Sequence, residues 1–152
     1  MWVPDLGGAS IGELLDVDIS GIAAGQQLSW NGTALVPVTE PFDVGLHLPD
    51  LGTAGALLAE IVLARPVDFP AAFSGSTGYA RISATAETVL DVQKNGSNIG
   101  TVTFAAASSA PTFALPSATS FAAGDRLAIV NEDPADASIA GVSLTFAGTR
   151  GS

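Results

Sequence analysis

Residues 79–93, with the sequence YARISATAETVLDVQ, decide the fold class because their side chains alternate in character along almost the whole stretch. Most even positions, from Ala80 to Val92, are small or apolar, and most odd positions are polar. A period of two is typical of a β-strand, because successive side chains point to opposite sides of a sheet. The stretch is therefore predicted to form one strand with a buried face and a solvated face.

The same alternation recurs through the second two-thirds of the chain. Within residues 139–147, Val142, Leu144 and Phe146 are predicted to point inward. Ser143 and Thr145, which lie between them, are predicted to point outward. Other short strands are predicted over residues 57–69, 99–105, 112–115 and 126–130. This spacing predicts an all-β fold, an antiparallel β-sandwich or jelly-roll-like domain.

Composition limits the classes of function. The chain has 152 residues, and 47% of them are hydrophobic, which is enough for a sizeable core. Only 13% are charged, about half the usual share, so apolar surface is expected to be buried between subunits. A net charge of −10 with five Lys and Arg argues against nucleic acid as a partner. No apolar stretch approaches the length of a membrane span, and the N-terminus lacks the features of a signal peptide, so no membrane insertion is expected.

The first 40 residues are predicted to be an attachment or trimerisation segment that precedes a β-sandwich domain over residues 41–150. Prolines within residues 37–50 mark the boundary. Asn31-Gly32 between two apolar runs predicts a hairpin. Because a two-stranded hairpin is marginally stable in water, its apolar side chains need a partner surface. The candidates for this subunit interface are Leu28, Trp30, Leu35 and Val36.

Side chains with catalytic potential are few and scattered. The single histidine, His47, falls in the proline-rich boundary and is interpreted as a surface residue. Asp16-x-Asp18 lacks the spacing of a calcium loop, so a solvated turn is favoured. The chain is therefore predicted to be no enzyme and to bind no metal or cofactor. Tyr79 and Arg81, on the polar face of residues 79–93, are the candidates for surface recognition, and Tyr79 is suited to stacking on a sugar ring.

Residues 14–37, LLDVDISGIAAGQQLSWNGTALVP, resemble an element of tailed-bacteriophage fibre and other virion structural proteins. The element reads L-x-D-V-D-x-S-G-x-x-x-G-x-x-L-x-W-N-G-T-x-W-V-P, and Leu35 stands where its second Trp usually stands. Residues 89–96, 99–104 and 119–127 resemble, more loosely, a β-rich domain of phage fibres and related particles.

The resemblance implies a protein located in the virion. Such fibre proteins are usually homotrimers, so three copies would pack their N-terminal elements together and contact other virion proteins. Three functions then compete. A trimeric fibre would recognise a glycan or protein on the host cell, whereas a capsid decoration or head-fibre protein would bind capsid subunits without a receptor. A glycan-degrading fibre enzyme is the third hypothesis, and it requires clustered carboxylates in a groove.

Overall fold

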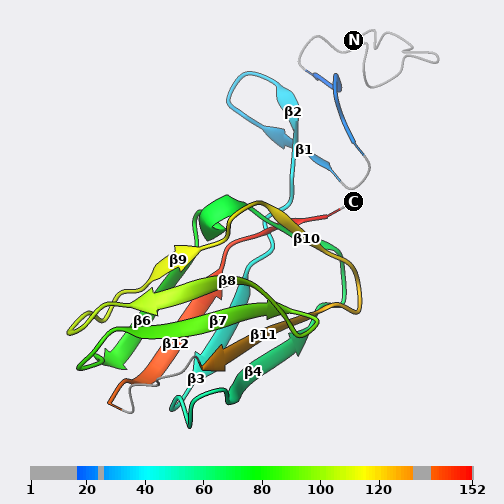
Figure 1. Cartoon of the computed structure of the whole chain (residues 1–152). Helices are drawn as coiled ribbons and strands as arrows, with labels where there is room; N and C mark the ends of the chain where they lie inside the picture. The colour runs from blue at the N-terminus through cyan, green and yellow to red at the C-terminus, as the bar shows by residue number, and fades with distance from the viewer. Residues whose placement is uncertain (1–16, 24–25, 132–137, 152) are drawn as a thin grey trace, which may run out of the picture. The chain divides into compact units, whose positions relative to one another are not determined.

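The computed structural model describes residues 17–23, 26–131 and 138–151 (Figure 1). Within them the fold is all-β, with antiparallel sheets packed together, which confirms the predicted β-sandwich class. The jelly-roll topology stays a prediction. Contacts divide the chain into two compact units, Met1–Glu40 and Pro41–Gly151. Among the described residues, no helix has the length and apolar character that crossing a membrane requires.

The described residues of the second unit form three sheets. The largest has the strand order β4-β11-β7-β8-β9, and two three-stranded sheets have the orders β3-β12-β6 and β10-β5-β13. The bounds are β3 (Val44–Leu48), β4 (Leu57–Val62), β5 (Val67–Phe69), β6 (Thr77–Ile82), β7 (Thr88–Lys94), β8 (Ser97–Phe104), β9 (Thr112–Ala114), β10 (Thr119–Phe121), β11 (Arg126–Asn131), β12 (Ala140–Phe146) and β13 (Thr149–Arg150), with a short 3-10 helix η2 (Ala71–Phe73).

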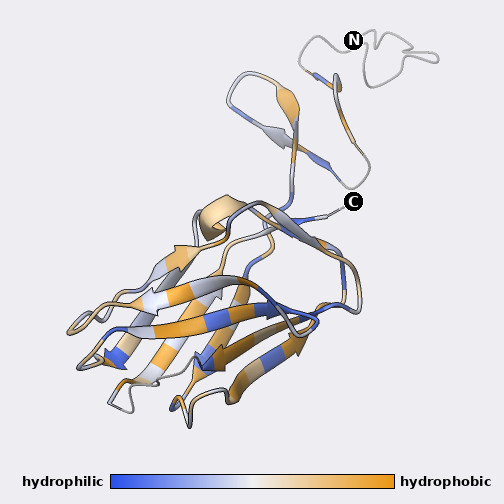
Figure 2. Ribbon diagram, in the orientation of Figure 1, coloured by the Kyte–Doolittle hydropathy of each residue, from blue (hydrophilic) through white to orange (hydrophobic). Residues whose placement is uncertain are grey.

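A cluster of phenylalanine rings occupies the core between the sheets. Phe69 is fully buried, and its ring lies edge-on to Phe73, Phe121 and Phe146, at centroid distances of 5.8, 5.4 and 6.4 Å. Edge-to-face pairs at these distances are a favourable arrangement of aromatic quadrupoles. The alternation of apolar and polar residues along the strands is visible in Figure 2, and it explains why each sheet buries one side in this core.

Residues 79–93 do not form one strand, which corrects the prediction from alternation. They divide between β6, in the sheet with β12, and β7, in the five-stranded sheet. Ala84 lies between the two strands, yet it is 1% exposed and accepts a hydrogen bond from the backbone N–H of Ala107. Ala80, Ala84 and Leu90 all point into the same core. Alternating burial is interrupted in the crossing, where Ile82 and Ala86 are exposed, and only Ala84 returns to the core between the two strands.

Two other expectations are corrected. The predicted strand over residues 57–69 is two strands, β4 and β5, in different sheets, because residues 63–66 turn the chain between them. Residues 37–50, predicted as a boundary, do contain the division between the two units after Glu40, but they also contain strand β3, with Val44 and Leu48 buried. His47 therefore lies within a strand and not in a loop. Prolines on both sides of this short strand indicate a turn or loop, so the sequence does not predict the strand.

The first unit contains the predicted hairpin, formed by β1 (Gln27–Trp30) and β2 (Leu35–Val38). Asn31 organises its loop, because its side-chain oxygen accepts hydrogen bonds from the backbone N–H groups of Thr33 and Ala34, both at 2.9 Å. Val17 forms a parallel bridge to Leu35 on the open edge of β2. The prediction of an antiparallel hairpin at Asn31-Gly32 is confirmed.

Candidate functional site

The sheet of β3, β12 and β6 has one side in the core and one side exposed. Val142, Leu144 and Phe146 of β12 are buried, as predicted, so the residues between them point outward. Antiparallel register sets the outward residues of the three strands in rows across the sheet. We call this surface the outer face, and it consists of Gly45, His47, Thr77, Tyr79, Arg81, Gly141, Ser143 and Thr145.

Tyr79 stands in the central row of the outer face. Ser143 of β12 pairs with His47 of β3 on one side and with Tyr79 of β6 on the other. The Ser143 hydroxyl lies 3.2 Å from Nδ1 of His47, within hydrogen-bonding distance. The Tyr79 side chain is 58% exposed, so its ring is open to a ligand. This row combines an aromatic ring, a hydroxyl and an imidazole.

Arg81 lies two residues beyond Tyr79, on the same side of β6, and is next to Gly141 of β12. Gly141 has a φ of +63°, and a Cβ placed there would lie 3.0 Å from the Cβ of Arg81 and 3.7 Å from its Cδ and Nε. A side chain at Gly141 would therefore crowd the Cβ of Arg81, whereas Cδ and Nε of Arg81 lie at an ordinary contact distance from this position of β12. Arg81 is exposed, so its positive charge is open to a ligand.

The charge of the outer face differs from that of the whole chain. The protein has 15 acidic residues against five Lys and Arg, but β3, β6 and β12 contain no Asp or Glu. Two of the basic side chains, Lys94 and Arg126, form ion pairs with Asp125 at 3.2 Å and with Glu60 at 3.5 Å. Arg81 makes no ion pair with a described residue. The outer face thus carries the positive charge of Arg81 and no carboxylate of its own, and the nearest acidic residues along β3 are Asp43 and Asp50, just beyond its two ends.

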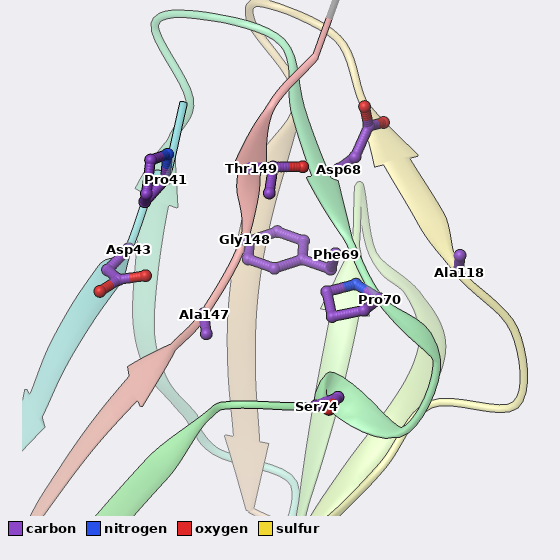
Figure 3. Close-up of a pocket in the computed structure, with 10 residues that line it drawn as sticks. All are labelled: Pro41, Asp43, Asp68, Phe69, Pro70, Ser74, Ala118, Ala147, Gly148 and Thr149. Atoms are coloured by element: carbon purple, nitrogen blue, oxygen red, sulfur yellow. The ribbon is translucent and has the colours of Figure 1, made fainter. Parts of the chain in front are cut away.

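A pocket of about 380 Å³ opens elsewhere in the second unit (Figure 3). Its lining is mainly apolar and includes Phe69, Pro70 and Ala147. The carboxylates of Asp43 and Asp68 stand on opposite sides of the Phe69 ring in the view of Figure 3. Such a lining offers apolar contact and negative charge, but the structure gives it no basic side chain among its residues.

The hairpin holds the residues predicted for a subunit interface. Register pairs Trp30 with Leu35, and Leu28 with Pro37, so Leu28, Trp30 and Leu35 share one face. Trp30 is 56% exposed. Val36 pairs with Ser29 and therefore points to the opposite face, so the four candidates do not form one surface. The four-residue loop after Trp30 sets this register, which the Asn-Gly signal alone does not reveal.

Asp18, another polar candidate, belongs to the first unit. Hydrogen bonds from the side chain and the backbone N–H of Ser20 lower the pKa of Asp18 below its ordinary value, and Asp16 lies outside the described residues. Within residues 17–23, 26–131 and 138–151, no group of three or more His, Cys, Asp or Glu side chains is placed to hold a metal ion.

Sequence reasoning missed three features of these sites. His47 was not placed near Tyr79, because cross-strand neighbours depend on register. The role of Gly141 depends on the position of Arg81 in the adjacent strand. The pocket is lined by residues from short strands and loops, which carry no periodic signal. The outward position of Ser143, however, follows from alternation.

Comparison of the chain with protein-family models, with curated proteins and with solved structures found no match.

Proposed function

We propose that the chain is a non-enzymatic structural protein of a bacteriophage virion, a fibre subunit that forms a homotrimer and recognises the host surface. The resemblance of residues 14–37 to a virion element supports this proposal. The separation of a hairpin unit from a β-sandwich domain is compatible with one part that assembles and another part that contacts a receptor.

The exposure of Trp30 carries the proposal. A tryptophan that leaves 56% of its surface in water gives up much of the stabilisation that burial of a large side chain supplies. Leu28 and Leu35 extend the same face of the hairpin, and a two-stranded hairpin is marginally stable without a covering surface. Equivalent faces of three copies would bury one another around a symmetry axis.

The composition supports the same assembly. Charged residues make up 13% of the chain, about half the usual share, so each copy has fewer charges to keep it monomeric. Exposed apolar side chains at Ile19 and Ile22, in the first unit, add to the surface that assembly would cover.

Sedimentation equilibrium at micromolar concentration tests the trimer. The expected mass is three times the chain mass of 15.2 kDa. The substitution Trp30→Gln is expected to shift the equilibrium toward monomer, because it removes the largest apolar side chain of the hairpin face.

Tyr79→Gln is the matched control. Tyr79 is 58% exposed against 56% for Trp30, but it lies in the second unit, so its loss is expected to leave the trimer intact. A wild-type chain that sediments as a stable monomer would contradict the proposed assembly. Dissociation by Tyr79→Gln but not by Trp30→Gln would move the subunit interface to the outer face.

Host recognition has a separate test. Fluorescently labelled protein is expected to bind to cells of the host. If it fails to bind cells but binds empty capsids, capsid decoration replaces the fibre as the function of the chain.

A further inference from the structure

The outer face has the composition of a carbohydrate-binding surface more than that of a protein interface. Tyr79 is the one large side chain of apolar character on the outer face. The residues around it on β3 and β12 have small side chains or none, so the Tyr79 ring protrudes from the surface; they are Gly45, Gly141, Ser143 and Thr145. A stable protein interface buries about 800 Å² on each partner, around a core of several apolar and aromatic anchors. A single aromatic ring beside hydroxyl groups suits the flat apolar side and the hydroxyl edge of a sugar ring.

Its polar groups stand at separations that one ligand can span. His47 and Tyr79 both pair with Ser143, so they lie two strand spacings apart, about 10 Å. Arg81 is two residues from Tyr79 along β6, a distance of about 7 Å. A short oligosaccharide that stacks on Tyr79 therefore reaches both Arg81 and the Ser143–His47 pair.

The charge indicates which kind of saccharide fits. A guanidinium binds a carboxylate or phosphate through parallel charge-assisted hydrogen bonds. β3, β6 and β12 hold no acidic residue that would repel an anion, although the chain as a whole has a net charge of −10. A neutral sugar gains nothing from the charge of Arg81, which makes no ion pair with a described residue, whereas an acidic sugar does.

We infer that the outer face binds an anionic saccharide of the host surface, with Tyr79 stacking on a sugar ring and Arg81 binding its carboxylate or phosphate. The inference rests on the proposed host-recognition function and names the ligand class and the residues that carry it. Gly141 is a positioning residue, because a side chain there would crowd the Cβ of Arg81.

Affinity electrophoresis tests the ligand class. The full chain is run through native gels that contain polygalacturonate, a carboxylated polysaccharide, or dextran, a neutral one. Retardation by polygalacturonate and none by dextran is expected. Arg81→Gln and Tyr79→Ala are each expected to weaken binding about tenfold, which corresponds to the loss of one charge-assisted hydrogen bond or one stacking contact.

Arg65→Gln is the matched control, because it removes the same charge from an exposed arginine in the turn between β4 and β5. It is expected to bind polygalacturonate as the wild type does. Equal retardation of Arg81→Gln and Arg65→Gln would overturn the inference, as would equal retardation by dextran. Unchanged melting temperatures would show that the variants are folded.

Host-cell labelling with the same variants separates this inference from the function on which it rests. Loss of labelling in Arg81→Gln but not in Arg65→Gln supports both. Wild-type labelling that Arg81→Gln and Tyr79→Ala retain in full overturns the saccharide site and leaves host recognition standing. Absence of wild-type labelling overturns host recognition itself.

Discussion

Replacing Gly100 with Ala is expected to destabilise the sandwich domain, whereas the same replacement at Gly45 is expected to stabilise it. Both glycines lie inside strands, Gly100 in β8 and Gly45 in β3. A Cβ at Gly100 would overlap the backbone carbonyl oxygen of Ala114 and lie 3.3 Å from Cε2 of Phe73. A Cβ at Gly45 would have no heavy atom within 4 Å.

The magnitude follows from which atom blocks the methyl group. Overpacking of a core typically costs 1–3 kcal/mol, and the obstacle at Gly100 is the backbone of β9, which is paired with β8 and cannot rotate away. We therefore expect a loss of about 3 kcal/mol for Gly100→Ala, a fall in melting temperature of about 10 °C. Gly45→Ala reduces the entropy of the unfolded chain and is expected to add about 0.5 kcal/mol.

Urea unfolding followed by far-ultraviolet circular dichroism measures both variants, because this signal reports on the strands of the sandwich. Calorimetry of the same samples gives the melting temperatures. If Gly100→Ala unfolds within about 0.5 kcal/mol of the wild type, a range typical of neutral surface substitutions, the close approach of β8 and β9 at this position is refuted.

Three further predictions concern the sandwich domain. Phe69→Ala is expected to lower the free energy of unfolding by about 4 kcal/mol, because the buried ring contacts three others. Urea titration measures the loss, and a loss below about 1 kcal/mol, the scale of a conservative core change, would contradict the prediction. Asn131→Ala is expected to lower the free energy of unfolding by about 2 kcal/mol, because the buried Asn131 amide donates to the Leu51 carbonyl at 2.7 Å. The same titration measures this loss, and an unchanged free energy of unfolding would contradict the prediction. Hydrogen bonds from Asn95 and the Ala122 N–H, together with Lys94, lower the pKa of Asp125 to about 2. The stabilisation that ionised Asp125 contributes is therefore complete above pH 4 and is lost as the pH falls toward 2. The difference in melting temperature between wild type and Asp125→Asn should shrink over that range, and a constant difference would contradict the assignment.

The sequence predicts best those strands that keep the same side in the core along their whole length. Alternation places β12 correctly because both neighbours, β3 and β6, leave the same side of it in the core. Alternation cannot divide residues 79–93, because Ala84 remains buried while the chain changes sheets. β3 is not predicted, because prolines flank it and because a strand of five residues shows too few alternations to detect.

The candidate site is predicted in part for the same reason. The exposure of Tyr79 and Arg81 follows from their odd positions on an alternating strand. Their neighbours His47 and Gly141 come from strands distant in sequence, and only the register of the folded sheet brings them to the same face. Val36 points to the face opposite Trp30, which Asn31-Gly32 does not reveal because the four-residue loop sets the hairpin register.

Antibody labelling of intact virus particles, viewed by electron microscopy, tests most directly the proposal that this chain is a virion fibre protein. We expect label on fibres at the tail of the particle, with none on particles assembled without the protein. Label confined to the capsid would make it a decoration protein. Intact particles that carry no label, although the antibody recognises the purified folded chain, would contradict a place in the virion.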